Sequence, residues 1–261
     1  MSLDYTIPPL LVKRGALYFA VDENATDAFN ENDVASWVAG GRFAWRWRDR
    51  GQLNETRCNV YMHLCNQVAT QNLPVLEIAC GPGLGLLPEI LAFNPNIQAT
   101  ATDSSSLLIE NWNDFFRMNE PGANINFAAM DASKMPITSN SVDIITSYIG
   151  FGSLKQAGAD QMNGLREALR VLKSGGRIYT VEQEFEDPAL IQHVFDRWGQ
   201  VNWFRDNKQT WPERFAAAGF IVEQENFMYR NKPTGWQLQD VAASFGLEIW
   251  ANTKAYVVRK P

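Results

Sequence analysis

Short apolar runs alternate with longer segments of helical period from about Val75 onward. This alternation predicts a strand, a crossover helix and a parallel strand in repetition. The segments expected to form the parallel strands are VLEIA, IQATATD, INFAAM, VDIITS and RIYTVE. Val75–Ala79 and Val142–Ile145 are nearly all apolar, which is typical of central strands that helices cover on both faces.

Helices are expected between and after these strands. One is indicated by apolar residues at three- and four-residue spacing, namely Met162, Leu165, Leu169 and Leu172. Gly175-Gly176 is expected to end it. A second helix is expected over about 189–198, and a third begins after Thr210, which forms a capping box with Glu213.

Two further strands are expected near the end of the chain. FIVEQENFMY (220–229) and NTKAYVV (252–258) alternate enough to form an antiparallel pair at one edge of the sheet. With the five parallel strands, they complete a doubly wound α/β fold with a seven-stranded, mostly parallel sheet.

The first 73 residues do not alternate in this way. They contain the charged run RWRDRGQ and the tryptophans Trp37, Trp45 and Trp47. We expect mostly helical segments that lie over the carboxyl ends of the strands. The chain is therefore expected to divide into an N-terminal helical cap, residues 1–73, and a main domain, residues 74–261.

Charge and composition narrow the function. The 23 basic and 29 acidic residues give a net charge of −6, which provides no broad attraction to nucleic acid or to an anionic membrane. The N-terminus MSLDYTIPPLLVKRG has two prolines in its apolar run and no preceding basic segment, so no signal peptide is expected. Since no apolar stretch suits a membrane helix either, we expect a cytoplasmic protein.

The strongest chemical signal is VLEIACGPGLG, an apolar strand followed by a glycine-rich turn that opens a helix. Such a turn lies at the carboxyl edge of the first strand, where ligands bind in open parallel sheets. Gly81 and Gly83 lack a Cβ, so the backbone can approach a ligand closely. A dinucleotide fingerprint fits poorly, because its third glycine would fall on Leu86. A tight turn without a ligand remains the alternative.

Asp103 ends the second strand, 103 − 83 = 20 residues past Gly83. A carboxylate in this place can accept hydrogen bonds from both hydroxyls of a ribose. This would suit any ligand that contains adenosine.

Five segments occur in the order LEIACGPG, TATDSS, MDASKMP, VDIITS and REALRVLKSGGR. Together they resemble the class I S-adenosylmethionine-dependent methyltransferases, especially the ubiquinone/menaquinone-type enzymes that act on small molecules. The resemblance covers about Val75 to Glu182 and implies a Rossmann-like fold and S-adenosylmethionine as cofactor. Carried over position by position, it implies that the cofactor is bound by Glu77, Ala79, Gly81, Gly83, Asp103, Ser104, Asp131, Ala132 and Ser147.

The resemblance assigns a part of the cofactor to each position. The glycine turn would face the methionine part, Asp103 would hold the ribose, and Ser147 would lie near the methyl donor. An ionised Asp131 can accept from the adenine amino group while the Ala132 N–H donates to a ring nitrogen. Glu77 can hold the cationic amine, directly or through water. The family usually has glycine where this chain has Ala79, which would tighten the site.

Residues that could assist catalysis are fewer. His193 follows the fifth strand, where this family often lines its acceptor site, and imidazole is the usual base near neutral pH. His63 is the second choice, and a packed or exposed histidine is the alternative for both. Glu182, Glu184 and Glu186 alternate along the fifth strand. We expect them to form a solvated edge and not a metal site.

These observations favour a methyltransferase that acts on a small organic acceptor by O-, N- or C-methylation. A noncatalytic protein that binds S-adenosylmethionine or regulates a partner is the first alternative, since the fold does not prove catalysis. An NAD(P)-dependent oxidoreductase is the second, because such enzymes also place a glycine turn after a strand.

Overall fold

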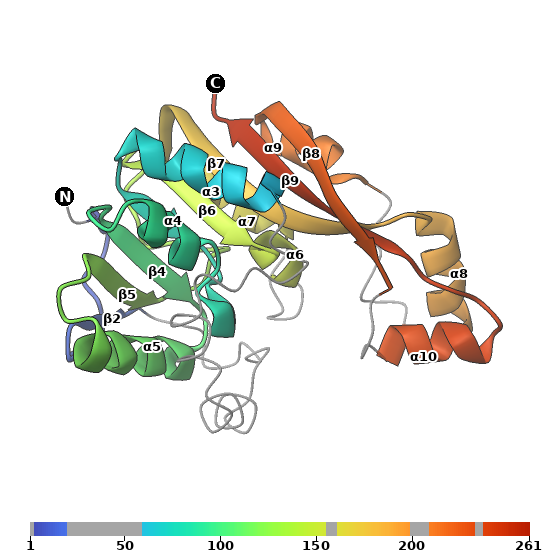
Figure 1. Cartoon of the computed structure of the whole chain (residues 1–261), viewed down its shortest axis with the longest axis horizontal. Coiled ribbons are helices and arrows are strands. Elements are labelled where there is room, and N and C mark those ends of the chain that lie inside the picture. The colour runs from blue at the N-terminus through green and yellow to red at the C-terminus, as the bar shows by residue number, and fades with distance from the viewer. Residues whose placement is uncertain (1–2, 20–58, 155–160, 199–208, 233–236) are drawn as a thin grey trace.

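The computed structural model describes residues 3–19, 59–154, 161–198, 209–232 and 237–261. Within these ranges the strands form one sheet in the order β1-β2-β5-β4-β3-β6-β7-β9-β8 (Figure 1). The strands are β1 (Leu11–Lys13), β2 (Ala16–Tyr18), β3 (Val75–Glu77), β4 (Ala99–Asp103), β5 (Ile125–Ala129), β6 (Val142–Tyr148), β7 (Leu172–Phe185), β8 (Ile221–Asn231) and β9 (Ala251–Arg259). The helices are α3 (Asn59–Gln71), the 3₁₀ turn η1 (Gly81–Gly83), α4 (Leu87–Phe93), α5 (Ser106–Asn119), α6 (Gly150–Ser153), α7 (Gln161–Val171), α8 (Pro188–Trp198), α9 (Trp211–Ala218) and α10 (Gln237–Ser244).

All seven strands expected from the sequence form. Strands β5, β4, β3, β6 and β7 are parallel, while β9 is antiparallel to both β7 and β8. The prediction of a mostly parallel α/β sheet is therefore confirmed. From β3 the chain first moves outward to β4 and β5, and then returns to the other side of β3 as β6. The carboxyl end of β3 is thus the switch point at which such sheets bind ligands.

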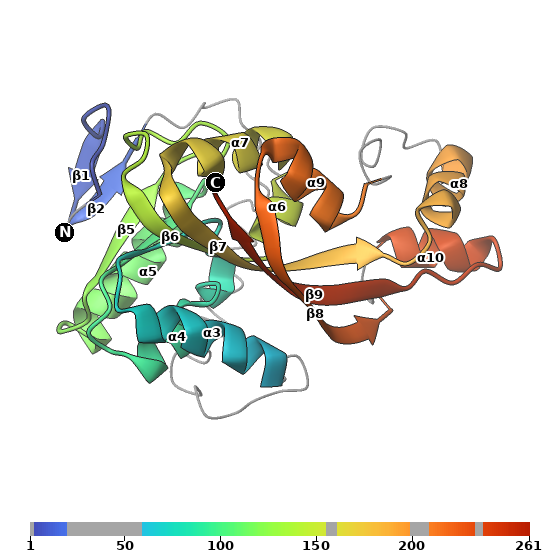
Figure 2. The same ribbon diagram turned by 90° about the horizontal axis from the view of Figure 1, so that it is seen from above.

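Helices cover both faces of the sheet (Figure 2). On one face α3, α4 and α5 contribute to an apolar cluster that includes the fully buried Val68, Ile90 and Trp112. On the other face α7 and α9 contribute the fully buried Leu165 and Phe215 to a second cluster. Burial of side chains of this size stabilises the fold by about 1.5–3 kcal/mol each, so the two layers fix the strand ends that carry the candidate site.

The strands β7, β8 and β9 extend beyond the rest of the sheet as a long arm (Figures 1 and 2). Helices α8 and α10 pack together at the far end of this arm. Ile191 and Val194 of α8 and Ala242 of α10 form a small apolar cluster with Ile249, which precedes β9. This cluster is separate from the two that flank the parallel strands, so the arm carries its own local core.

The N-terminal region differs from the expected helical cap. Residues 11–18 form a hairpin in which β1 pairs with β2, and β2 adds to the sheet in parallel beside β5. The sheet therefore has nine strands in the part of the chain that is described, and not seven. Within residues 1–73 the described helix is α3. The segment 20–58, which carries the three tryptophans of the expected cap, lies outside the described residues.

The three helices expected beyond residue 160 are present, and one of them ends earlier than expected. α9 begins at Trp211 after Thr210, and both hydrogen bonds of the capping box with Glu213 are present. α8 coincides with the helix expected over 189–198. α7 ends at Val171, four residues before the glycine pair at 175, because the chain there continues directly into β7. Among the described helices, none is long and apolar enough to cross a membrane.

Candidate cofactor site at the carboxyl edge of the sheet

The glycine-rich turn follows β3, and backbone hydrogen bonds close it and attach it to the end of β4. The Cys80 N–H donates to the Thr102 carbonyl at the end of β4, at 2.8 Å, and the Gly85 N–H donates to the Cys80 carbonyl at 2.9 Å. Gly81 has a φ of +55°, and a Cβ added there would meet no heavy atom of the described residues within 4 Å. The backbone at Gly81 thus borders open space. Such a cradle suits a ligand group, and a side chain would fill it.

Ala79, the position at which the resembling family usually has glycine, also adopts the left-handed region, with a φ of +50°. This conformation is costly for any residue with a Cβ. Its methyl group lies at 3.1 Å from where a Cβ on Gly150 would be, so the methyl group packs toward the turn that follows β6. Ala79 therefore keeps the backbone geometry of a glycine and narrows the space between the ends of β3 and β6.

Glu77 lies under the glycine turn. Its side chain is fully buried, and Oε2 accepts from the Thr146 hydroxyl at 2.6 Å and from the Leu86 N–H at 3.3 Å. Oε1 has no hydrogen-bond partner among the described residues and would lie 1.8 Å from a Cβ on Gly85. Burial raises the pKa of Glu77 to about 8, and the two hydrogen bonds oppose this shift. The structure thus gives Glu77 a role in supporting the turn, while contact with a ligand amine stays a proposal.

Asp103 connects the glycine turn to the end of β4. One carboxylate oxygen accepts from the Gly81 N–H at 2.9 Å, and the other accepts from the Ser105 N–H at 3.0 Å. The Gly81 carbonyl in turn accepts from the indole N–H of Trp112 at 2.9 Å. Gly81 is therefore held from both sides. The sequence alone does not predict this bond, because a tryptophan on the core face of α5 resembles any packed tryptophan. Ser104 is half-buried beside Asp103.

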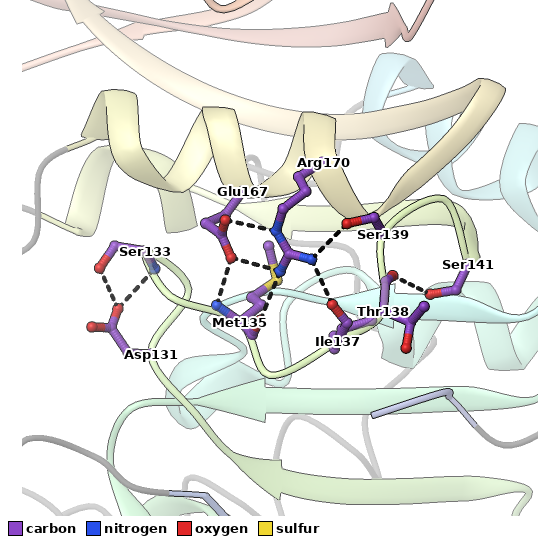
Figure 3. A network of polar contacts seen from close by, with 9 residues as sticks. All are labelled: Asp131, Ser133, Met135, Ile137, Thr138, Ser139, Ser141, Glu167 and Arg170. Carbon is purple, nitrogen blue, oxygen red and sulfur yellow. Dashed lines mark hydrogen bonds and ion pairs between the residues drawn. The ribbon is translucent and has the colours of Figure 1, made fainter. Parts of the chain in front are cut away.

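Asp131 and Ala132 follow β5, next to Asp103 across the sheet. The Met130 N–H donates to the Asp103 carbonyl at 2.9 Å, which links the ends of β4 and β5. Asp131 is half-buried, and its Oδ1 accepts from the Ser133 N–H at 2.7 Å and from the Ser133 hydroxyl at 2.8 Å (Figure 3). These two bonds set the direction of the carboxylate. Ala132 is buried beside it.

Ser147 lies near the end of β6, next to the end of β3. Its hydroxyl donates to the Ile78 carbonyl at 3.3 Å. A Cβ on Gly150 would lie 2.1 Å from the Ser147 hydroxyl and 2.8 Å from the Ile78 carbonyl, so the turn after β6 packs closely against both. The structure thus gathers the ends of β3, β4, β5 and β6, with the residues implied for the cofactor, at one edge of the sheet.

Glu182 differs from the expected solvated edge. It is fully buried, because α6 and α9 cover this end of β7, where the Trp211 indole of α9 donates to the Gln183 carbonyl. Its oxygens accept from the Phe151 N–H at 3.2 Å, from the Gly152 N–H at 3.0 Å and from the Thr180 hydroxyl at 2.9 Å. Burial raises the pKa of Glu182 to about 8 despite these donors. Glu182 therefore holds the turn that follows β6, a role that period-2 spacing alone could not reveal.

The other two glutamates of that row are paired with cations. Glu184 forms an ion pair with Lys254, and Glu186 forms two hydrogen bonds with Arg230 at 2.6 and 2.7 Å. Across the described residues, no group of three or more histidines, cysteines or carboxylates is arranged to hold a metal ion. Of the three glutamates, Glu182 is thus buried and holds a turn, while Glu184 and Glu186 form ion pairs with basic side chains.

The two histidines do not join the cluster of strand ends. His193 is exposed on α8, whose buried side faces α10 at the far end of the arm. His63 is exposed on α3, where its Nε2 lies 3.0 Å from the Gln67 amide nitrogen. The role of His193 as a base that faces the acceptor therefore stays a prediction, and its exposed place on α8 favours the alternative of an exposed histidine. Cys80 is buried, and burial raises the pKa of its thiol well above the usual value, which agrees with a space-filling residue.

Part of the chain that contains these strand ends matches a known protein family. Residues 75–176 match the family described as "Methyltransferase domain". A ubiquinone/menaquinone biosynthesis C-methyltransferase UbiE from Agrobacterium fabrum is 27% identical over 124 residues, which are 48% of this chain and 46% of that protein. A demethylmenaquinone methyltransferase from Deinococcus radiodurans is 27% identical over 195 residues, 69% of this chain and 75% of that protein. This chain thus covers about half the length of the first of these relatives.

Solved structures share the fold. CrArsM, an arsenic(III) S-adenosylmethionine methyltransferase from Chlamydomonas reinhardtii, aligns with a TM-score of 0.53 at 16% identity, over 72% of this chain and 64% of that one. The [4+2]-cyclase SpnF aligns with a TM-score of 0.53 at 18% identity, over 77% of this chain and 80% of that one. Likeness at this level shows the fold alone.

The chain therefore contains a class I methyltransferase domain, the class that uses S-adenosylmethionine. Within this class it has distant similarity to the UbiE and demethylmenaquinone methyltransferases.

Proposed function

We propose that this chain transfers a methyl group from S-adenosylmethionine to a small organic acceptor. The observation that carries the proposal is the joint placement of Gly81 and Asp103. The Gly81 backbone borders open space, and the Asp103 carboxylate is bound to its N–H at 2.9 Å. A group that hydrogen-bonds to the carboxylate of Asp103 would thus come beside the turn at the switch point of the sheet, where a ligand with a ribose and a charged tail would fit.

The residues that would hold the cofactor divide by element. Asp103 with Ser104 would bind the ribose, and the turn from Ala79 to Gly83 would border the methionine part. Asp131 would accept from the adenine amino group, and the buried Ala132 would donate its N–H to a ring nitrogen. Each of these residues lies at or just after the carboxyl end of a parallel strand, which supports its assignment.

When bound, S-adenosylmethionine supplies an electrophilic methyl group on a sulfonium. The protein's share of such a reaction is mainly to orient the acceptor and exclude water. Ser147 is fully buried near the end of β6, beside the end of β3, and the turn after β6 packs against it. We infer that this turn, which Glu182 holds through Phe151 and Gly152, borders the acceptor.

The acceptor is proposed as a small organic molecule. The names of the two relatives above refer to C-methylation and to demethylmenaquinone, which makes aromatic quinone precursors the first compounds to test. The net charge of −6 argues against a nucleic acid acceptor. O- and N-methylation stay open within this proposal.

The test is a screen of quinols, phenols and amines with S-adenosylmethionine that carries a labelled methyl group, with Asp103→Ala as the matched negative control. Label transfer by the wild-type protein and its loss in the variant support the proposal. Thermal stabilisation by S-adenosylhomocysteine without any transfer would favour a noncatalytic cofactor-binding protein. Stabilisation by NADH in place of S-adenosylhomocysteine would favour an oxidoreductase and contradict the proposal.

A further inference from the structure

The loop between β5 and β6, residues 130–141, carries Asp131 at one end and has no helix or strand of its own. Its middle is nevertheless buried, since Met135 is 4% exposed and Ile137 is 0% exposed. Buried peptide groups outside a helix or sheet need partners from elsewhere, because an unpaired one costs about 1–3 kcal/mol. The position of this loop therefore depends on what its backbone binds.

On one side the loop binds a pair of residues on α7. Arg170 donates to the carbonyls of Met135 and Ile137, both at 2.7 Å, and to the Ser139 hydroxyl at 3.1 Å (Figure 3). Glu167 accepts from the Met135 N–H at 2.9 Å. The two side chains also bind each other, through two hydrogen bonds of 2.8 Å. All three guanidinium nitrogens of Arg170 are thus used.

On the other side the loop binds the N-terminal segment. The Pro136 carbonyl accepts from the Thr6 N–H at 2.9 Å, and the Thr138 N–H donates to the Asp4 carbonyl at 2.8 Å. Alternate peptide groups of the loop therefore face α7 and the N-terminal segment. Loss of the α7 side would leave the groups at Met135 and Ile137 without their partners.

The Met135 backbone is connected to the Asp131 carboxylate through a tight turn. The Lys134 N–H donates to the Asp131 carbonyl at 3.1 Å, and Ser133 donates twice to the Asp131 carboxylate. A shift at Met135 would therefore be transmitted to the direction of the carboxylate. Asp131 itself contacts neither Glu167 nor Arg170 in the hydrogen bonds that Figure 3 draws.

We propose that the Arg170–Glu167 pair is a positioning pair that sets the selectivity of the site for adenine, because it fixes the loop that carries Asp131 and Ala132. The inference rests on the proposed cofactor site. It adds that selectivity for the base is determined on α7, by two side chains outside the site. Lysine cannot replace Arg170, since a single ammonium cannot bind two carbonyls and a carboxylate in one plane.

The test compares two ligands by calorimetry: S-adenosylhomocysteine and S-inosylhomocysteine, in which a carbonyl oxygen replaces the amino group of the base. The wild-type protein is expected to bind the adenine ligand about 10- to 100-fold more tightly, because the inosine ligand leaves polar groups of the site unpaired. Arg170→Lys is expected to reduce this ratio at least about fivefold. Glu167→Gln should reduce it in the same direction and serves if Arg170→Lys does not fold.

Arg166→Lys is the matched control, since Arg166 is exposed on the same helix. It should leave the ratio unchanged. If Arg170→Lys and Glu167→Gln weaken both ligands by the same factor, the pair only stabilises the fold and the inference is overturned. The proposed cofactor site has separate failures. Wild-type protein that binds neither ligand would contradict it, and so would an unchanged ratio in Asp131→Asn.

Discussion

The carboxylate of Asp103 accepts a hydrogen bond from the backbone N–H of Gly81, at 2.9 Å, although 22 positions separate the two residues in the chain. Gly81 lies in the turn after β3, and Asp103 is the last residue of β4. The same carboxylate also accepts from the Ser105 N–H at 3.0 Å. One side chain therefore connects the turn after β3 to Ser105, the residue that caps α5.

Asp103→Ala is expected to weaken binding of S-adenosylhomocysteine by about 1.5–3 kcal/mol, because charge-assisted hydrogen bonds to the ribose are lost. Asparagine has one acceptor oxygen and no charge, so Asp103→Asn cannot keep the bonds to both Gly81 and Ser105 and should weaken binding too. Calorimetry measures both. Asp114→Asn on α5, where the carboxylate pairs with Arg14 near the surface, is the control for removal of a charge. An unchanged dissociation constant in folded Asp103→Ala would remove Asp103 from the site.

Gly81→Val is expected to abolish binding of S-adenosylhomocysteine while most of the fold persists. Its branched Cβ would enter the open space beside the turn, and the left-handed backbone adds strain of about 1–2 kcal/mol. Gly246→Val is a closely matched control, because Gly246 also has a positive φ, of +71°, and no heavy atom of the part of the chain that is described lies within 4 Å of an added Cβ. Calorimetry and thermal melting separate the effects. Equal loss of binding in both variants, or full binding by Gly81→Val, would contradict the assignment.

The two buried glutamates give the free energy of unfolding a pH dependence. Burial raises the pKa of Glu77 and of Glu182 from 4.5 in the unfolded chain to about 8. The folded state thus holds these protons more tightly, so the stability they contribute is present below pH 4.5 and is lost as the pH rises through about 8. Between about pH 4.5 and about pH 8, each group can lower the unfolding free energy by up to about 1.4 kcal/mol per pH unit.

Urea unfolding at about pH 6 and about pH 9 measures this decline. Glu182→Gln should be less stable at pH 6 by about 1–3 kcal/mol, because an amide NH₂ faces a backbone N–H of the turn after β6. Its decline toward pH 9 should be shallower than that of the wild-type protein, since one titrating group is gone. Glu223→Gln is a suitable comparison, because the pKa of this glutamate is lowered by hydrogen bonds from Arg177 and Arg259. A parallel decline in Glu182→Gln would show that Glu182 is ionised when buried.

His193→Ala distinguishes two hypotheses for this histidine. A general base would predict a rate of methyl transfer about 10²- to 10⁴-fold lower. The exposed position on α8, at the far end of the arm, predicts a rate within about twofold of the wild-type rate, as expected for a side chain away from the reacting groups. The measurement is the initial rate with the acceptor found in the screen. A large loss that shrinks as the pH rises would restore the role of a base.

The sequence predicted the sheet well, because five strand segments are short and largely apolar, the last two alternate, and helical periods or turns separate them. The N-terminal hairpin was missed, since its strands have three residues each and its outer strand exposes Leu11 and Val12. A signal was present in Arg14-Gly15. Both residues have positive φ, as a two-residue hairpin turn requires, but arginine is rare in the first position.

The site was predictable only as far as local motifs reach. Gly81 and Asp103 were predictable because each lies at or just after the end of a predicted strand, and in the structure a hydrogen bond connects them. The burial of Glu182 was not predictable, because it depends on α6 and α9, which come from distant parts of the chain. For the same reason His193 was placed by its distance along the sequence from β7, while the extended arm carries α8 away from the other strand ends.

A crystal structure of the protein with S-adenosylhomocysteine tests the central claim most directly. We expect a ribose hydroxyl within about 3.2 Å of the Asp103 carboxylate, the amino acid part beside Gly81, and the adenine amino group toward Asp131. A ligand bound elsewhere, or a ribose that leaves Asp103 without contact, would contradict the placement of the cofactor at this edge of the sheet.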